Sequence, residues 1–243
     1  MRVPRIYHPA SISLQNETEL SADAFQHLIK VLRLNVGDSI VLFNGDGQNY
    51  EAKITSVQKK SAQFVATSSQ ANASESPVNI HLAQVVSRGD RMDFVLQKSV
   101  ELGVTEITPL FSERCGVKLS GDRLEKKQLQ WQKIVHSACE QCGRSVVPQV
   151  KPAQQLTDFI ASSFEGLRLT LDPTATQPLS SFQQAKKGIQ LLIGPEGGFT
   201  DTEVSAAGQQ GFKPMRLGPR ILRTETAALS ALTAVQYQFG DLS

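Results

Sequence analysis

The sequence is poor in cysteine, and the cysteines present do not form a recognisable site. There are 3, an odd number, which argues against a disulfide framework. Cys139 and Cys142 make a single C-x-x-C pair without a second pair to complete a zinc site, and their spacing puts both on one face of a helix. We favour packing over a metal or redox role for them, and we expect no metal site.

Long apolar runs and a strong excess of one charge are also missing. No apolar stretch approaches the ~20 residues of a membrane-spanning helix, and the N-terminus shows no signal-peptide pattern, so we expect a cytoplasmic protein without membrane contact. The formal net charge is only +2, from 25 Lys and Arg against 23 Asp and Glu. Any affinity for nucleic acid must therefore come from local clusters of cations.

Several catalytic and nucleotide-binding patterns are absent as well. The 4 histidines are scattered at positions 8, 27, 81 and 136 without metal-ligand spacing, and no G-x-S-x-G elbow or Ser/His/Asp order is present. Neither G-x-G-x-x-G nor G-x-x-x-x-G-K-[ST] occurs. Metal-dependent hydrolysis, acyl transfer and phosphate binding on such a loop are therefore poorly supported.

The first part of the chain contains short strands and one helix. The pattern of residues 21–34 predicts a helix with Ser21 as its N-cap. Residues 39–43, 48–57 and 62–67 have the composition of strands, and Asn44-Gly45-Asp46-Gly47 is a strong hairpin signal. These elements predict a small β-barrel domain. The polar stretch 68–77 is typical of a linker, and we place the domain boundary between residues 72 and 73.

Strands alternate with helices in the rest of the chain, which predicts an α/β domain with a mainly parallel sheet. Trp131 lies on the apolar stripe of a long predicted helix, so we expect it in the core. The predicted strands are 78–86, 107–111, 146–150, 167–171, 189–193 and 214–217; the predicted helices are 90–102, 123–142, 156–164 and two that begin near Thr200 and Thr224.

Two consecutive strands of this domain end in glycine-rich loops. GPEGG at 194–198 follows the first, and the next helix has the capping-box pair Thr200 and Glu203. Gly218-Pro219 follows the second, before a helix that Thr224 can cap. Ligands of open α/β sheets bind beyond the carboxyl ends of the strands. We therefore expect a ligand site here, and because Glu196 would repel a phosphate, a neutral or cationic ligand fits better.

The residues of these loops resemble a known family. LLIGPEGG and the later LGPRILRTETAALSAL are similar to motifs of the SPOUT class of S-adenosylmethionine-dependent RNA methyltransferases. Within that class the chain resembles the RsmE-type family, which methylates N3 of a uracil in 16S ribosomal RNA. The supporting stretches are RVPRIYHP, SRGDRMDFVLQKSVELGVTEITPLFSERCGVK and ACEQCGR at residues 2–9, 87–118 and 138–144. The resemblance extends over essentially the whole chain.

The resemblance implies a fold and a set of cofactor contacts. It implies an α/β SPOUT domain over residues 73–243, with a mainly parallel sheet and a C-terminal trefoil knot. A PUA-like β-barrel over residues 1–72 would bind RNA, and the protein would be a homodimer with its C-terminal helix at the interface. S-adenosylmethionine would bind in the knot. The implied cofactor residues are Leu171, Gly194, Pro195, Glu196, Gly197, Gly198, Leu217, Gly218, Ile221 and Leu222.

Methyl transfer to N3 of uracil has to deal with the proton that N3 carries. A cation can stabilise the resulting anion, or a base can remove the proton. Arg220 and Arg223 are the candidate cations and Glu225 is the candidate base. A helix N-terminus tends to make a carboxylate a weak base, so we favour charge stabilisation.

Cationic and aromatic residues outside the glycine loops are candidate RNA contacts, with a solvated or structural role as the alternative. They are Arg2, Arg5, Tyr7, Lys30, Arg33, Arg88 and Arg91. The expected partner is 16S ribosomal RNA within the small subunit. Two other functions stay open: a SPOUT enzyme acting on another RNA such as tRNA, and an RNA-binding ribosome-assembly protein without catalysis.

Overall fold

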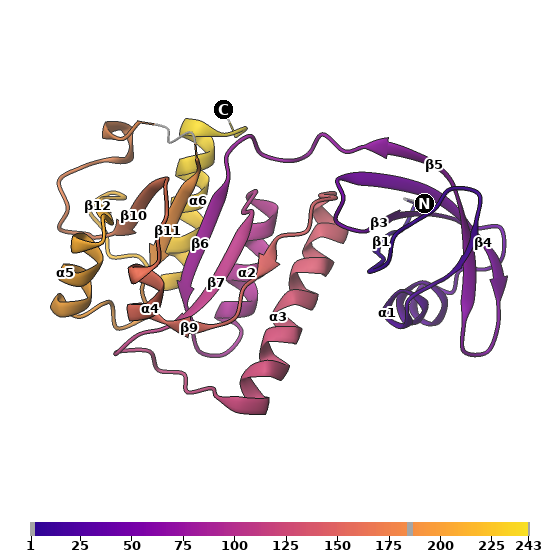
Figure 1. Ribbon diagram of the computed structural model, residues 1–243, viewed down its shortest axis with the longest axis horizontal. Helices are drawn as coiled ribbons and strands as arrows, with labels where there is room; N and C mark the ends of the chain where they lie inside the picture. The colour runs from indigo at the N-terminus through magenta and orange to yellow at the C-terminus, as the bar shows by residue number, and fades with distance from the viewer. Residues whose placement is uncertain (1–2, 184–186, 243) are drawn as a thin grey trace. The chain divides into compact units, whose positions relative to one another are not determined.

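The structure is a computed structural model, in which residues 3–183 and 187–242 are described. The chain forms two compact units (Figure 1). One consists of the residues up to Glu75 together with His136–Val147, and the other of Ser76–Val135 together with the residues from Pro148 onward. Helix α3 (Gly121–Cys142) therefore contributes to both units. Within the described residues, no helix combines the length and apolarity needed to cross a bilayer.

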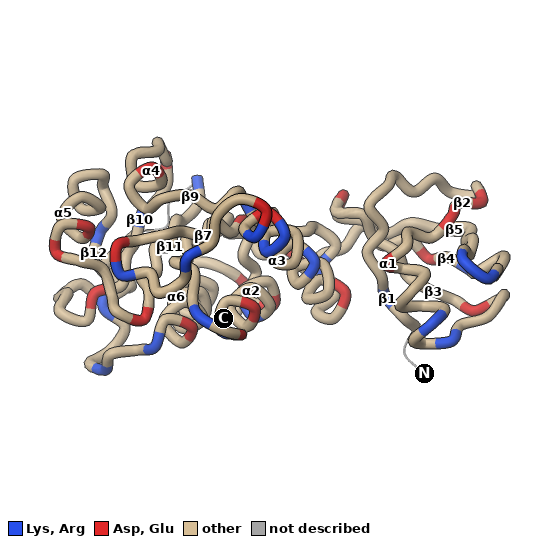
Figure 2. Tube along the Cα trace, turned by 90° about the horizontal axis from the view of Figure 1, so that it is seen from below, with Lys and Arg blue, Asp and Glu red and all other residues tan. Residues whose placement is uncertain are grey.

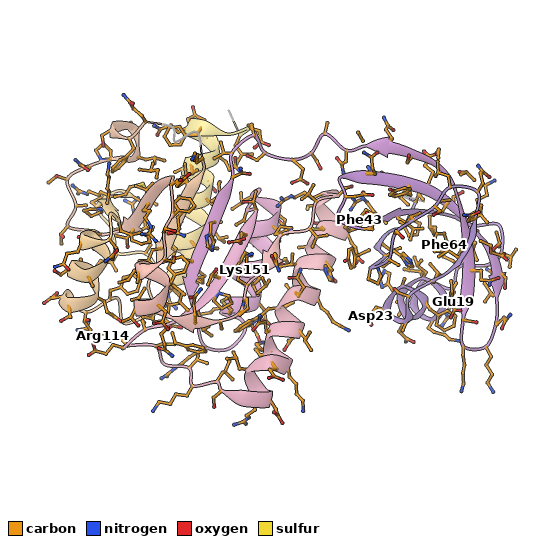
Figure 3. The ribbon with its side chains drawn as sticks, viewed as in Figure 1. Glu19, Asp23, Phe43, Phe64, Arg114 and Lys151 are labelled. Atoms are coloured by element: carbon orange, nitrogen blue, oxygen red, sulfur yellow. The ribbon has the colours of Figure 1, made fainter. Side chains whose placement is uncertain are left out.

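The first unit is built on a five-stranded sheet with the order β1-β3-β4-β5-β2. β1 pairs with β3 in parallel, and the other pairs are antiparallel. Alternate side chains of the strands face the core, where Leu42 and Phe64 are fully buried; Phe64 is labelled in Figure 3. The strands are β1 (Arg5–Tyr7), β2 (Glu17–Glu19), β3 (Ser39–Phe43), β4 (Gln48–Val57) and β5 (Ala62–Ala71).

Strand β5 is longer than predicted, so the predicted linker starts too early. Residues 68–71 pair with β4 in the register Gln48↔Ala71 to Glu51↔Ser68. Their polar side chains resemble those of a linker, but their backbone groups complete the ladder of β4. This pairing partner was not visible in the local composition.

The helix predicted over 21–34 begins as expected and ends early. The Ser21 hydroxyl accepts a hydrogen bond from Ala24 N at 3.2 Å, which confirms the N-cap. After α1 (Ala22–Phe25) the chain winds into a π-helix, η1 (Gln26–Val31). Arg33 then takes a φ of 58°, a left-handed conformation that ends a helix. The prediction of a regular helix to residue 34 is therefore wrong.

The second unit contains a parallel sheet of seven strands. Its order is β12-β10-β11-β6-β7-β8, and β9 also pairs with β7. β11 is buried at every position, as expected for a strand covered by helices on both faces. The strands are β6 (Ile80–Val85), β7 (Glu106–Phe111), β8 (Gln149–Val150), β9 (Gln154–Gln155), β10 (Leu167–Leu171), β11 (Ile189–Ile193) and β12 (Lys213–Met215). The α/β prediction is confirmed.

Helices cover both faces of this sheet. α6 (Thr224–Phe239) packs against α2 (Arg91–Glu101), β6 and β11 on one face. On the other, α4 (Leu156–Ala161) and α5 (Asp201–Gln209) form a core cluster with residues such as Ala83 and Leu192. A short helix, η2 (Leu179–Ser181), precedes β11. The capping box of Thr200 and Glu203 is present at the start of α5, and Trp131 is fully buried, both as predicted.

A row of polar side chains crosses the face of the sheet covered by α4 and α5. Arg168, Gln190, His81 and Glu106 occupy directly paired positions on β10, β11, β6 and β7, and we call these four residues the polar row. Arg168 Nε donates to Gln190 Oε1 at 2.9 Å, so the Gln190 amide nitrogen faces His81 Nδ1, 3.1 Å away. His81 Nε2 lies 2.7 Å from the Thr108 hydroxyl. Because the Gln190 amide nitrogen can only donate, a neutral His81 accepts at Nδ1 and carries its proton on Nε2, with Glu106 Oε1 3.4 Å from the same Nδ1.

The polar row predicts that stability depends on pH. Burial lowers the pKa of His81 below its ordinary value; Glu106 acts against this, while Lys151 and Arg168 add to it. Below about pH 6.5, the ordinary pKa of histidine, His81 binds a proton in the unfolded chain but stays neutral in the folded chain. The free energy of unfolding should therefore fall as pH drops below ~6.5, with a slope of up to ~1.4 kcal/mol per pH unit from this group.

Urea denaturation followed by the fluorescence of Trp131, the single tryptophan, measures this slope in the second unit. His81→Gln should show a shallower dependence on pH than the wild type between about pH 7.5 and about pH 5.5. Equal pH dependence of the free energy of unfolding in wild type and His81→Gln would contradict the role given to His81. His8 also has a pKa lowered by burial, but it lies in the first unit and is present in both proteins.

Candidate functional site

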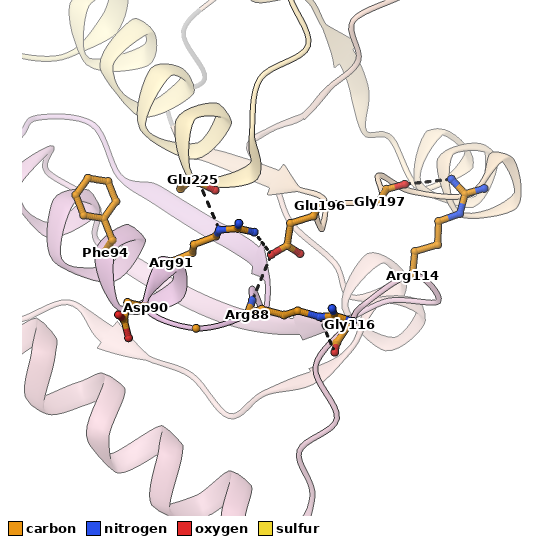
Figure 4. A pocket seen from close by; sticks show the side chains of 10 residues that line it. Arg88, Asp90, Arg91, Phe94, Arg114, Gly116, Glu196, Gly197 and Glu225 are labelled. Atoms are coloured by element: carbon orange, nitrogen blue, oxygen red, sulfur yellow. Dashed lines mark hydrogen bonds and ion pairs between the residues drawn. The ribbon is translucent and has the colours of Figure 1, made fainter.

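The glycine-rich loops lie at one edge of the parallel sheet, because the carboxyl ends of parallel strands share an edge. The loops after β6, β11 and β12 all start there. A cavity of about 1020 Å³ opens beside the loops that follow β6 and β11 (Figure 4). Its walls combine three arginines, three carboxylates and one aromatic ring. The lining residues are Arg88, Gly89, Asp90, Arg91, Phe94, Arg114, Gly116, Glu196, Gly197 and Glu225.

Arg91 lies between two carboxylates in this cavity. Its Nη1 is 2.9 Å from Glu196 Oε1, and its Nε is 4.0 Å from Glu225 Oε1 (Figure 4). Arg88 N also donates to Glu196 Oε1, at 3.3 Å. Arg91 starts α2, Glu196 belongs to the first glycine loop and Glu225 to the first turn of α6. The structure thus brings together residues that the sequence had placed in an RNA contact, a cofactor contact and a catalytic role.

Glu196 is held in its ionised form. Burial acts to raise its pKa, but backbone N–H groups of Glu196 and Arg88 and the Arg91 guanidinium outweigh burial and lower the pKa. At neutral pH this position therefore carries a negative charge at the first glycine loop. A cationic group of a ligand would be attracted to it.

Two other arginines hold the wall of the cavity together. Arg88 Nε donates to Gly116 O at 3.1 Å, and Arg114 Nη1 donates to Gly197 O at 3.2 Å. A Cβ at Gly197 would lie 3.4 Å from the Arg114 Cβ, an ordinary contact distance, so the packing of Arg114 does not by itself require glycine here. Phe94 keeps 45% of its surface exposed beside these cations. The cavity therefore offers both a flat apolar face and several hydrogen-bond donors.

The second glycine loop meets the first through Thr224. Thr224 is the first residue of α6 and Arg223 is the N-cap, without a side-chain capping bond, so the prediction of Thr224 as the cap is wrong. Instead the Thr224 hydroxyl donates to Gly194 O at 2.6 Å. A long-range acceptor has replaced the local capping bond.

The other predicted cofactor residues lie outside the lining of the cavity. Leu171 ends β10, and Leu217 and Leu222 are half-buried. Gly218 has a φ of 73°, as a tight turn of the second loop requires. Ile221 is 87% exposed, an unusual state for an isoleucine. Among the described residues, Glu196 and Gly197 are the two predicted cofactor residues that line the cavity.

The three catalytic candidates differ in their surroundings. Arg220 and Arg223 are exposed, and their side chains make no hydrogen bond or ion pair within residues 3–183 and 187–242. Glu225 is half-buried, and its Oε2 is buried with no hydrogen-bond partner in the described part of the chain. Two uncommitted guanidinium groups thus flank the start of α6, next to a carboxylate with an unused acceptor.

Arg5 and Tyr7, two of the candidate RNA contacts, make their contacts within the first unit. Arg5 donates to Cys139 O at 2.7 Å and to Arg144 O at 2.8 Å, and its guanidinium lies 3.9 Å from the centre of the Phe43 ring. Tyr7 stacks on His136 with ring centres 3.9 Å apart. These contacts attach residues 136–147 to the N-terminal sheet. Cys139 is fully buried there, which agrees with a packing role.

Of the other RNA candidates of this unit, Lys30 belongs to the π-helix η1 and Arg33 follows it. Lys30 Nζ donates to Lys59 O at 3.2 Å and lies 5.0 Å from the centre of the Phe25 ring. Arg33 is exposed. Arg2 lies outside the described residues. In the view of Figure 2, Lys and Arg positions are interspersed with Asp and Glu positions along the backbone of both units.

Comparison with known proteins identifies the family. Residues 74–236 match the profile described as "RNA methyltransferase domain", and residues 20–67 match "RNA methyltransferase PUA domain". The chain is 38% identical over 243 residues to "Ribosomal RNA small subunit methyltransferase E" of Buchnera aphidicola subsp. Schizaphis graminum, covering 100% of this chain and 99% of that protein. It is 32% identical over 228 residues to the Bacillus subtilis protein of the same name, covering 90% and 89%. The chain belongs to the family of proteins named ribosomal RNA small subunit methyltransferase E.

Two solved structures are similar over their whole length. One is a methyltransferase from Legionella pneumophila in complex with S-adenosylmethionine, with a TM-score of 0.97 and 43% identity. The other is a ribosomal RNA small subunit methyltransferase E from Neisseria gonorrhoeae bound to S-adenosyl methionine, with a TM-score of 0.93 and 40% identity. Both comparisons cover 100% of each chain. The predicted family and its α/β and PUA-like parts are confirmed, whereas the knot stays a prediction.

Proposed function

We propose that this protein transfers the methyl group of S-adenosylmethionine to N3 of a uridine in 16S ribosomal RNA, acting on the small subunit as a cytoplasmic homodimer. The observation that carries the proposal is the meeting of both glycine loops with the ionised Glu196 at one sheet edge. The full-length similarity to proteins named ribosomal RNA small subunit methyltransferase E supports the class of reaction. Residues 1–72 are proposed to bind RNA and residues 73–243 to carry out catalysis.

The residues present fit S-adenosylmethionine. The glycine loops expose main-chain N–H and C=O groups that can recognise an adenine edge, and Ile221 and Leu222 offer apolar surface. Glu196 places a negative charge where a cationic ligand can bind, with a pKa held low by Arg88 and Arg91. When bound, the cofactor supplies an electrophilic methyl group. Leu171, Gly194–Gly198, Leu217 and Gly218 are the further residues proposed to hold it.

The chain's own groups then act on the uracil. The N3–C bond forms while the S–C bond breaks, the electron pair of the S–C bond stays on sulfur, and the N3 proton passes to solvent water. Arg220 and Arg223 are proposed to stabilise the negative charge on O2 and O4. Glu225 is the alternative, as a base whose Oε2 accepts the proton. We favour charge stabilisation because both guanidinium groups are exposed and uncommitted among the described residues.

The target uridine has to be unpaired or flipped out, because N3 is hidden in a Watson–Crick pair. The exposed Phe94 ring can stack on a base, and Arg88 and Arg91 lie beside it in the cavity wall. In the first unit, Lys30 and Arg33 are the proposed phosphate contacts. Arg5 and Tyr7 are committed to internal contacts, and we propose that they act by holding residues 136–147 in place.

The direct test is methyl transfer from labelled S-adenosylmethionine to ribosomal RNA from cells that lack this protein. Assembled small subunits and naked RNA are compared, and the nucleosides are identified by mass spectrometry. The expected product is 3-methyluridine confined to small-subunit RNA. Cofactor binding with product in tRNA instead would show a different target. A silent calorimetric titration with S-adenosylmethionine would favour the non-catalytic assembly protein.

A further inference from the structure

A buried chain of hydrogen bonds connects β6 to both glycine loops. Gln84 Nε2 donates to the Thr224 hydroxyl oxygen at 2.9 Å, and this hydroxyl donates to Gly194 O at 2.6 Å. Gln84 is 0% exposed and Thr224 is 4% exposed. Gly194 is the first residue of the first loop, and Thr224 directly follows the second loop. We call Gln84, Thr224 and Gly194 the loop clasp.

The direction of these bonds is determined by the groups involved. A carbonyl oxygen can only accept, so the Thr224 hydrogen points at Gly194 O, and the Thr224 oxygen is left to accept from Gln84. Gln84 Nε2 also donates to Val85 O at 2.9 Å, which fixes the orientation of its amide group. Gln84 Oε1 is consequently buried without a hydrogen-bond partner in the described part of the chain. The three residues of the loop clasp therefore form one connected chain of hydrogen bonds, from Gln84 to Thr224 and from Thr224 to Gly194.

An amide at this position is unfavourable for stability alone. A buried acceptor without a partner destabilises the folded state. The neighbouring positions on the same face of β6, Ile80 and Leu82, are apolar and fully buried. A leucine or methionine at position 84 would continue that apolar face. The glutamine therefore needs a reason other than core packing, and the bond to Thr224 supplies it.

We infer that Gln84 and Thr224 are positioning residues that fix the spacing between the two glycine loops for S-adenosylmethionine. This inference rests on the proposed function, which assigns both loops to the cofactor. Without the hydroxyl, Gly194 O loses its donor and the start of α6 loses its tie to the first loop. The two sides of the cofactor site are then no longer held at one separation, and the ligand must order them on binding.

Thr224→Val tests the inference, because valine keeps the shape of threonine and removes the hydroxyl. Its dissociation constant for S-adenosylmethionine, measured by calorimetry, should rise about tenfold, the loss expected for one buried hydrogen bond. Thr224→Ser keeps the hydroxyl and should stay within about threefold of wild type. Thr233→Val is the matched control on the same helix, since Thr233 is exposed and bonds to Leu229 O. It should bind like the wild type.

Gln84→Met provides an independent measurement at the other end of the clasp. It should also weaken cofactor binding about tenfold, and the double variant with Thr224→Val should lose little more, because both changes break one connected chain. Thermal unfolding is recorded first, and binding is measured well below each midpoint. Wild-type affinity in folded Thr224→Val or Gln84→Met would overturn the inference. A wild-type protein that binds no S-adenosylmethionine would instead overturn the proposed function.

Discussion

Replacing Arg223 with alanine is expected to slow methyl transfer about 100-fold while changing the dissociation constant for S-adenosylmethionine less than about threefold. Negative charge develops on the uracil oxygens as the N3 proton leaves, and a cation aimed at that charge acts mainly in the transition state. An interaction made only there lowers the rate when it is removed and leaves ground-state binding of the cofactor intact.

In this structure, replacing Arg223 with alanine removes a charge and no side-chain bond to another described residue. Arg223 is the N-cap of α6, but its side chain makes no capping bond, and its carbonyl accepts the bond from Ala227 N at 2.7 Å whichever side chain is present. The guanidinium is exposed. Alanine therefore removes a charge without breaking the helix start, and unfolding should shift by less than about 0.5 kcal/mol.

Single-turnover transfer to small subunits and calorimetric binding of S-adenosylmethionine separate the two effects. Arg123→Ala, an exposed arginine on α3, is the matched control and should retain wild-type transfer. The rate of Arg223→Ala should also rise more steeply with pH than that of the wild type, because solvent base then supplies the anion that the cation no longer stabilises. Equal losses in transfer and cofactor affinity would show that Arg223 serves cofactor binding instead.

The strands of this protein were largely predictable because their signals are local. The segments 39–43, 48–57, 167–171 and 189–193 have the bounds that alternating or continuous apolar patterns predicted. The capping box at Thr200 was correct for the same reason, since both partners lie within one turn. Predictions failed where a residue bonds to a group far away in the sequence. Residues 68–71 form a strand because they pair with β4, and the Thr224 hydroxyl donates to Gly194 O instead of capping α6.

The candidate site depends even more on contacts between residues that are distant in the sequence. The sequence motifs identified the glycine loops and the residues at the start of α6. They could not show that Arg91 contacts Glu196, because 105 positions separate the two in the chain. Phe94, Arg114 and Gln84 were not singled out for the site, since each looks like an ordinary helix, loop or strand residue until its neighbours are known. The roles of Arg220, Arg223 and Glu225 stay predictions.

The polar row leads to the largest effect expected on stability. Arg168 is buried, and its guanidinium donates to Gln190 Oε1 at 2.9 Å and to Gln210 O at 2.8 Å and Ser162 O at 2.9 Å. Ser162 and Gln210 are the C-caps of α4 and α5. One side chain therefore satisfies the last carbonyls of two helices and the neighbouring strand, and its positive charge suits helix C-termini.

Arg168→Met should lower the free energy of unfolding of the second unit by about 3–5 kcal/mol. Methionine can fill much of the volume, but it donates no hydrogen bond, so the buried Gln190 Oε1 and the partly buried carbonyl oxygens of Ser162 and Gln210 lose their partner at once. Arg168→Lys should fall between the two proteins, because lysine keeps the charge and lacks the planar fork. Arg123→Met, at an exposed site, should change stability by less than about 0.5 kcal/mol.

Urea denaturation followed by Trp131 reports on this unit, since the tryptophan is fully buried within it. A loss below about 1 kcal/mol for Arg168→Met would show that the helix ends find other donors. The expected loss has a consequence for activity, because Arg168 is on β10, whose last residue, Leu171, is proposed to contact the cofactor. Folded Arg168→Lys should bind S-adenosylmethionine with near wild-type affinity at low temperature and lose binding at a lower temperature than the wild type. The polar row would then act by keeping the strands folded under the site, and the loop clasp by spacing the loops above them.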